Sequence, residues 1–227
     1  MKAKFEPVVN IGGVRVERIP LKTKIITESD SMADIIREFA LPHIKEGDIL
    51  TISESPLAIT QGRAIPVEQI KPGRLARFLS SKVMKTPYGI GLGAATSMQC
   101  AIDECGAGRI LVAAVIGGIS KKLGRKGDFY RVAGKQAALI DAAETTPVEP
   151  FTHTVIKGPL KPGKVAQELA DEFGFPVAVM DINDIGGSWA IGYSKGLSKA
   201  FLEMTMKDNP QGQGAELTPL CIIRKLD

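Results

Sequence analysis

The sequence of 227 residues predicts an α+β fold of irregular α/β type, arranged in two lobes. Hydrophobic residues make up 44% of the chain, which is long enough to bury one large core or two small ones. Stretches with the alternation of strands and stretches with helical spacing both occur. They follow one another without a strict strand–helix–strand rhythm, and this favours α+β over a doubly wound fold.

The elements expected in the first part of the chain begin with an alternating run. In chain order we expect a strand over 14–21, a helix over 31–44, a strand within 46–55, a strand pair or ribbon over 59–67 and a helix over 72–83. Pro42 should interrupt or end the first helix, and Pro72 should open the second.

The second part of the chain begins with the glycine-rich residues 88–93. From there we expect a turn leading into a helix that ends near 106, a strand over 109–120, an alanine-rich stretch over 129–147, a helix and buried strand over 162–184, a helix over 197–208 and a strand over 216–226. Residues 88–93 are the best candidate boundary, and a soft one, between an N-terminal lobe over 1–87 and a C-terminal lobe over 88–227.

Composition excludes several classes of function. The formal charge is +4, and the densest basic run is Lys121, Lys122, Arg125 and Lys126, either a solvated loop or a patch that steers an anionic substrate. With three tyrosines, one tryptophan and no basic–aromatic interleaving, nucleic acid is not an expected partner.

The three cysteines have no CxxC spacing, so neither a zinc site nor a thioredoxin-type site is expected. They fit the reduced thiols of a cytoplasmic protein. We see no signal peptide and no stretch of about 20 apolar residues, so no contact with a membrane is expected.

Polar residues follow the apolar run "VAVM" in the stretch "VAVMDINDIGG", residues 177–187. Asp181, Asn183 and Asp184 would lie at the carboxyl end of a buried strand, where α/β proteins place ligands. Oxygen donors of this kind suit Mg²⁺ or Mn²⁺, and the paired glycines would let the backbone approach a ligand. The alternative interpretation is a turn in which an Asx side chain ends the strand.

Asp141 is a second candidate metal ligand, at the end of the small and apolar stretch "GKQAALID". Paired in space with Asp184 it would hold a divalent ion; alone it is a helix cap or a surface acid. Neither histidine is assigned as a base, because His43 and His153 lie far apart in the chain. The GxGxG of residues 89–93 has neither Rossmann nor P-loop spacing, so it reads as a structural turn.

Five stretches together resemble the coenzyme F420 γ-glutamyl ligase (F420-0:L-glutamate ligase) family, of which the chain would be a divergent member. They are "VERIPLKTKIITESDSMADII", "EGDILTISESPLAITQGRAIPV", "GRLARFLSSKV", "RVAGKQAALIDAA" and "VAVMDINDIGG". The resemblance covers roughly residues 14–190. It implies the two-lobed fold of that family and a homodimer.

The resemblance also implies a reaction and its residues. Members form an amide bond with GTP as co-substrate, adding L-glutamate to the coenzyme F420 precursor. By resemblance, Asp141 and Asp184 hold Mg²⁺ or Mn²⁺ beside the nucleotide. Pro20, Leu21 and Lys22 lie along the loop that binds phosphates. Arg63 lies close enough to hold an anion.

The chain departs from the family at two places. Ala58 and Ile59 stand where members have a serine–lysine pair, so the lysine expected to touch phosphate is missing. The arginines that follow the second aspartate in the family are absent from "DIGGSWAIG". Two further hypotheses therefore stay open: a non-catalytic protein that binds a nucleotide or another anion on the same fold, and a structural partner in a larger assembly.

Overall fold

The structure is a computed structural model that describes residues 5–83, 91–125, 127–145, 148–183 and 187–226. Strands and helices mix as the sequence predicts, and the α+β fold class is confirmed. The chain forms two compact units. The first combines Met1–Gln61 with Pro159–Asp227, and the second is Gly62–Gly158.

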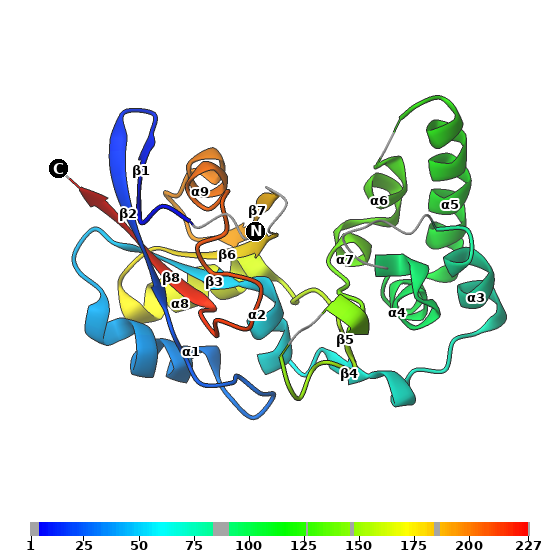
Figure 1. The fold of residues 1–227 in the computed structure, drawn as a ribbon, viewed down its shortest axis with the longest axis horizontal. Helices are drawn as coiled ribbons and strands as arrows, with labels where there is room; N and C mark the ends of the chain where they lie inside the picture. The colour runs from blue at the N-terminus through cyan, green and yellow to red at the C-terminus, as the bar shows by residue number, and fades with distance from the viewer. Residues whose placement is uncertain (1–4, 84–90, 126, 146–147, 184–186, 227) are drawn as a thin grey trace. The chain divides into compact units, whose positions relative to one another are not determined.

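A six-stranded sheet forms the centre of the first unit (Figure 1). Its strands, in the order in which they pair, are β1 (Val8–Ile11), β2 (Val14–Leu21), β8 (Leu220–Leu226), β3 (Ile49–Ser53), β6 (Val177–Ile182) and β7 (Ser188–Tyr193). Among the strand pairs that the described residues form in this sheet, β3 and β6 alone run parallel. Since β8 is antiparallel to both of its neighbours, β2, β3 and β6 all run in one direction. Their carboxyl ends therefore meet at the same edge of the sheet.

Helices cover both faces of this sheet. They are α1 (Met32–Ile35), continued by η1 (Ile36–Ala40) and η2 (Leu41–His43), then α2 (Glu54–Thr60), α8 (Pro162–Phe173) and α9 (Lys199–Thr205). The first core joins α1, η1, α2 and α8 to one face through residues such as Leu57 and Leu169. The second core joins α9 to the other face through Leu202. The amphipathic spacing of α8 puts its apolar stripe on the sheet.

Two arginines, the buried Arg18 and the half-buried Arg224, tie distant segments of the first unit together. Arg224 donates to both carboxylate oxygens of Asp48, at 2.9 and 2.6 Å, and Asp48 is almost fully buried. Arg18 binds the Asp208 carboxylate in the same two-pronged way. Planar guanidinium–carboxylate pairs of this kind combine strength with a fixed geometry.

The second unit is mostly helical. Its elements are β4 (Ala64–Pro66), η3 (Val67–Gln69), α3 (Arg74–Ser80), η4 (Gly91–Gly93), α4 (Ala95–Cys105), α5 (Ala107–Lys122), α6 (Asp128–Ala133), α7 (Lys135–Ala138), η5 (Ala143–Thr145) and β5 (Thr154–Ile156). Strands β4 and β5 pair antiparallel. Many of its fully buried side chains are alanines, among them Ala76, Ala101 and Ala113, and small side chains let helices approach closely.

Most of the expected elements are confirmed: β2, β3, α3, α4, α8 with β6, α9 and β8 all fall within their expected ranges. The strand expected over 109–120 is wrong, because these residues lie inside α5. Their β-branched residues favour a strand locally, but sixteen consecutive residues make helical hydrogen bonds instead. The expected ribbon over 59–67 is half wrong. Helix α2 runs to Thr60, and β4 pairs with β5, far along the chain.

The two units differ from the lobes expected at 1–87 and 88–227. Residues 84–90, which contain that boundary, lie outside the described residues, and both α3 and α4 on its two sides belong to the second unit. The first unit draws on both ends of the sequence because β8 pairs with β2 and β3, and β6 pairs with β3. Long-range strand pairing of this kind leaves no mark in local composition.

Candidate functional site

The carboxyl edge of the six-stranded sheet gathers polar residues from several strands. Leu21 lies opposite Leu220, which lies opposite Ile52, which lies opposite Val179, so four strands are in register just before this edge. The residues that follow β2, β3 and β6 therefore come out at the same side. This is the place where open α/β sheets bind ligands.

Glu54 is a residue at this edge that the sequence did not single out. It follows β3 directly, begins α2, and is only 8% exposed. A buried carboxylate at a strand end is unusual unless it has partners, and Glu54 does have interactions within the molecule. The apolar strand before it and the helix after it were the available signals.

The loop over 209–219 runs across the same edge. Thr23 N donates to Leu217 O at 2.8 Å, and Ser53 N donates to Pro219 O at 2.8 Å, so the loop is bound to the ends of β2 and β3. Leu217 has φ of 54° and Asn209 has φ of 53°. Non-glycine residues in the left-handed region cost free energy, and in proteins they cluster at functional sites.

Gln211 anchors this loop from inside. Its side-chain nitrogen Nε2 donates to Pro219 O at 2.6 Å, and its backbone oxygen accepts from Thr218 Oγ1 at 2.7 Å. Gln211 is 3% exposed, and its Oε1 has no hydrogen-bond partner among the residues that the structure describes. A buried acceptor is normally satisfied, so this oxygen is a place for a water or ligand donor.

The turn between β6 and β7 carries the aspartate-rich stretch. Asn183 N donates to Gly187 O, and Gly187 N donates to Asn183 Oδ1, both at 2.9 Å. Asn183 thus closes the turn in the way the Asx-turn interpretation expected. Asp181 lies directly opposite Trp189, which is 47% exposed, and a side chain at Gly187 would collide with the Trp189 ring. Asp184 lies outside the described residues, so its role as a metal ligand stays a prediction.

The three residues expected along the phosphate loop have different surroundings. Pro20 and Leu21 are the last residues of β2, and Leu21 is part of the buried core. Pro20 also has no N–H group to offer a phosphate. Lys22, the next residue, is exposed and stands at the carboxyl edge. Lys22 is therefore the one of the three that presents a charge to a ligand.

Arg63 and Asp141 come together in the second unit, on the two sides of β5. Asp141 forms a bridge with Ile156, with N–H···O distances of 2.9 and 3.2 Å. Lys157 N, one residue further, donates to Arg63 O at 3.0 Å. The backbone thus holds Asp141 beside Ile156, the last residue of β5, and Arg63 beside Lys157, the residue that follows it.

Arg63, which is buried, belongs to an ionic cluster with the half-buried Glu104 and Lys157. The Glu104 carboxylate accepts from Arg63 Nη2 at 2.9 Å and from Lys157 Nζ at 2.8 Å. Arg63 Nε also donates to Gly158 O at 2.5 Å. Burial alone would raise the pKa of Glu104, but the hydrogen bonds and charges of Lys157 and Arg63 hold it below its ordinary value. Two cations share one anion, so the cluster keeps a net positive charge.

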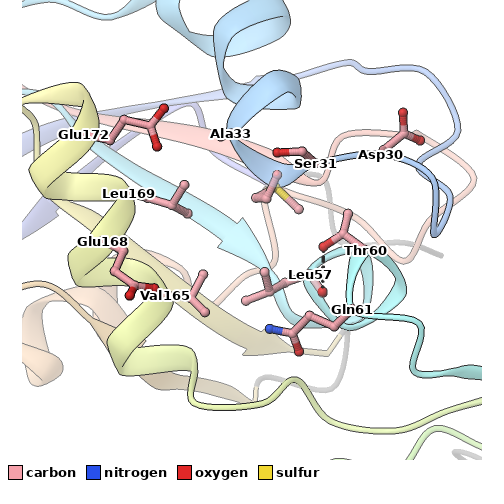
Figure 2. Close-up of a pocket in the computed structure, with 11 residues that line it drawn as sticks. Asp30, Ser31, Ala33, Leu57, Thr60, Gln61, Val165, Glu168, Leu169 and Glu172 are labelled. Atoms are coloured by element: carbon pink, nitrogen blue, oxygen red, sulfur yellow. Dashed lines mark hydrogen bonds between the residues drawn. The ribbon is translucent and has the colours of Figure 1, made fainter.

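A pocket of about 420 Å³ lies between α1, α2 and α8 of the first unit (Figure 2). Its apolar lining includes Leu57, Val165 and Leu169, and the carboxylates of Glu168 and Glu172 stand at its side. Asp30 also lines it. Hydrogen bonding from Lys24 and from Thr27 lowers the pKa of Asp30. The volume is that of a small-molecule site. None of the site residues predicted from the sequence lines this pocket.

Carboxylate and amide oxygens are the donors that Mg²⁺ and Mn²⁺ prefer, and Asp141 and Asp181 supply carboxylates. Each is a donor of the kind that a hard divalent ion takes; Asp141 belongs to the second unit and Asp181 to the first. Within the described ranges, however, no three His, Cys, Asp or Glu residues gather in a metal-binding group. Asp141 is exposed in the second unit, and its expected partner Asp184 is not described.

Comparison with known proteins agrees with the resemblance. The family model of F420-0:Gamma-glutamyl ligase matches residues 20–223. A curated relative, the coenzyme F420:L-glutamate ligase of Methanopyrus kandleri, is 31% identical over 74 residues. That match covers 33% of this chain and only 28% of the relative. In the part of the chain that the structure describes, no helix is both long and apolar enough to cross a membrane. Because the family match extends over most of the sequence, the chain belongs to the F420-0:gamma-glutamyl ligase family.

Proposed function

We propose that the protein is an acid–amino-acid ligase that joins L-glutamate to the coenzyme F420 precursor or to a related carboxylate. The observation that carries the proposal is the family match over residues 20–223. The carboxyl edge of the first unit supports it, because the exposed Lys22 and the loop over 209–219 both lie at this edge.

The proposed reaction uses GTP as co-substrate and proceeds in two transfers. A carboxylate oxygen of the acceptor attacks the γ-phosphorus, the bond to the β-phosphate oxygen breaks, and GDP leaves. The glutamate amine then attacks the acyl carbon and loses a proton, while inorganic phosphate leaves with the electron pair of the C–O bond. A bound Mg²⁺ or Mn²⁺, held by Asp141 and Asp184, would neutralise phosphate charge.

The protein's own residues would hold the reactants. We assign to Lys22 an ion pair with the transferred phosphate, because it is exposed at the edge where β2 ends. The loop over 209–219 would limit access of water to the reactive acyl phosphate. The positive cluster around Arg63 would attract an anionic substrate to the second unit, although the Arg63 guanidinium is itself occupied by Glu104.

A second candidate function is a nucleotide- or anion-binding protein without catalysis. It is favoured by Ala58 and Ile59, which are buried in α2 and replace the family's serine–lysine pair. Neither side chain can contact a phosphate. Lys22 would compensate for the missing lysine only if it reaches the transferred group, and this is the point that an experiment must decide.

The test begins with binding. Trp189 is the only tryptophan in the sequence and lies opposite Asp181, so its emission reports directly on ligands near this edge. We expect GTP with Mn²⁺ to change this emission and to raise the thermal unfolding temperature. Lys22→Ala should weaken binding about tenfold. Lys195→Ala is the matched control, because Lys195 is equally exposed but follows β7, at the opposite edge.

Turnover then separates the two functions. Phosphate release from GTP that depends on L-glutamate and on a deazaflavin acceptor supports the ligase. Saturable GTP binding with no release under any combination of acceptor and amino acid supports the binding protein instead. Pairing of two copies belongs to the same proposal, as the resemblance implies.

A further inference from the structure

Lys22 stands on a short piece of backbone that is held on both sides. Before it, Leu21 lies opposite Leu220 as the last pair of the β2–β8 ladder. After it, Thr23 N donates to Leu217 O at 2.8 Å, and Thr23 is buried. The Lys22 side chain itself is exposed. These backbone contacts therefore decide where its positive charge stands.

The contact at Thr23 belongs to the loop over 209–219 and not to the ladder. Continued past its last pair, the β2–β8 register would place Thr23 opposite Thr218. The Thr23 N–H bonds to Leu217 O instead. Leu217 has φ of 54°, and its own N–H donates to Gly214 O at 2.9 Å. Because a leucine in the left-handed region costs free energy, other contacts of the loop must hold it there.

Gln211 supplies such contacts from the interior of the loop. Its Nε2 donates to Pro219 O at 2.6 Å and, more weakly, to Thr51 O on β3 at 3.5 Å. Its backbone oxygen accepts from Thr218 Oγ1 at 2.7 Å. Gln211 therefore holds both residues that follow Leu217. With 3% of its surface exposed, it makes these bonds away from water, where a hydrogen bond is stronger.

The orientation of the Gln211 amide follows from its neighbours. Both groups beside Nε2 are carbonyl oxygens, which only the nitrogen end of an amide can bind. The other end, Oε1, is buried and has no hydrogen-bond partner among the described residues. Leucine has nearly the size of glutamine, so Gln211→Leu removes the contacts of Nε2 and breaks no bond of Oε1 within the described part of the chain.

We propose that Gln211 is a positioning residue, which holds the loop so that Leu217 fixes the backbone beside Lys22 and aims the ammonium group at the nucleotide phosphates. The proposal rests on the proposed function, in which Lys22 binds the transferred phosphate. Ala58 and Ile59 stand in α2 where the family has its serine–lysine pair. The cation at this edge would come instead from the end of β2, set in place by the loop before β8.

The first test needs no substrate and follows amide hydrogen exchange in the full chain. In Gln211→Leu we expect the Thr23 amide to exchange about tenfold faster, because the loop no longer holds its acceptor. The Leu50 amide, bonded to Pro176 O at the other end of β3, should keep its rate. An unchanged rate at Thr23, or an equal increase at Leu50, overturns the proposal.

Gln213→Leu is the matched control for this experiment. Gln213 lies in the same loop, but its side chain is exposed and makes a long bond of 3.4 Å to Ile182 O. We expect this variant to exchange like wild type at Thr23. If Gln211→Leu does not fold, Thr218→Val replaces it, because it removes the bond to the Gln211 backbone and keeps the shape of the side chain. The same pattern at Thr23 is expected.

The second test is a double-mutant cycle on the affinity for GTP with Mn²⁺. Lys22→Ala should weaken binding about tenfold and Gln211→Leu about fivefold. The double variant should bind no more weakly than Lys22→Ala, since a lysine that is absent cannot be misplaced. A glutamine that only stabilises the unit would lower affinity equally in both backgrounds. Additive losses therefore overturn the proposal.

The cycle also separates this inference from the proposed function. If wild type binds no GTP, or if Lys22→Ala binds it as tightly as wild type, the assignment of Lys22 to the phosphate is wrong, and the inference falls with it. If Lys22→Ala weakens binding and Gln211→Leu does not, the inference alone is overturned.

Discussion

The two units of this chain are stabilised in different ways. The first packs large aliphatic side chains such as Leu50 and Leu202 on both faces of a sheet and is tied by two arginine–carboxylate pairs, each with one buried partner. The second packs helices through buried alanines, contains the ionic cluster of Arg63, Glu104 and Lys157, and leaves large apolar side chains of α5 such as Val115 and Ile119 exposed. The first unit can therefore be stable by itself, whereas the second has surface left to bury. The predictions below use this difference, in order of expected effect.

The largest effect is expected from Gly192→Val in the first unit. A Cβ at Gly192 would lie 2.3 Å from the carbonyl carbon of Pro162 and 2.4 Å from the nitrogen of Gly163. Both are backbone atoms and cannot rotate away, so strand β7 and the start of α8 must separate. We expect a loss of about 3 kcal/mol or more in the free energy of unfolding.

Urea unfolding with thiol labelling measures this loss by unit, because Cys221 lies in the first unit and Cys100 in the second. In Gly192→Val we expect Cys221 to be labelled at a lower urea concentration, at which Cys100 is still protected. Simultaneous labelling of both cysteines would show that the units unfold together and would remove the distinction drawn above.

Glu104→Gln should produce the next largest effect, in the second unit. It leaves two cations, the buried Arg63 and the half-buried Lys157, without the carboxylate that they share. We expect a loss of about 2 kcal/mol, read from the labelling of Cys100. Asp103→Asn is the control, since Asp103 is exposed and should change stability by less than about 0.5 kcal/mol. An effect of Glu104→Gln as small as that would contradict a structural role for the cluster.

Acid should destabilise both units, through different carboxylates. Burial raises the pKa values of Glu104 and Asp208, but Lys157 and Arg63 in one case and Arg18 in the other bring each below its ordinary value. A folded-state pKa below the unfolded one gives stability that is present at neutral pH and is lost as the pH falls through the acid range.

The thermal unfolding temperature should therefore be nearly constant from about pH 8 to pH 6, and it should decrease below about pH 5. Glu104→Gln should flatten the acid dependence of Cys100 labelling and leave that of Cys221 unchanged. If Glu104→Gln instead flattened the acid dependence of Cys221 labelling and left that of Cys100 unchanged, the prediction that Glu104 stabilises the second unit would be contradicted.

The smallest effect is expected from Gly163→Ala, and it sharpens the contrast with Gly192. Gly163 lies in the first turn of α8 and has nothing within 4 Å of a Cβ. Alanine there should raise stability by about 0.5 kcal/mol, because it reduces the freedom of the unfolded chain. The unfolding temperatures of Gly163→Ala and Gly192→Val, measured side by side, test this contrast. A loss of stability in Gly163→Ala would contradict it.

Local patterns predicted the fold class because the hydrophobic periodicity of most segments predicts whether they form a helix or a strand. The helix stopped at Gly174 and the strand that follows it are an example. The α5 region failed because its valines and isoleucines favour a strand locally, while contacts with α6 and α4 select a helix. The grouping into units failed because it rests on pairing between strands that are far apart in the sequence.

The candidate site was predictable only where a charged residue directly follows a predicted strand. Lys22 follows a clear strand, and its place at the carboxyl edge follows from that strand's direction. Gln211 and the loop around it were not predicted, because a buried amide within "NPQGQG" has no periodic signal. The ion pair of Arg63 with Glu104 was equally hidden, since the two partners are 41 positions apart in the sequence and only the fold brings them together.

The position of β8 has a consequence for synthesis on the ribosome. This strand lies between β2 and β3 in the sheet, yet it follows every other strand in the sequence. As the chain emerges from its N-terminus, β2 and β3 must wait with unpaired edges until residues 220–226 arrive. The second unit is continuous and can fold in the meantime. Nascent chains stalled before residue 220 should therefore hold a folded middle between two unfinished ends, and they are the species most in need of a chaperone.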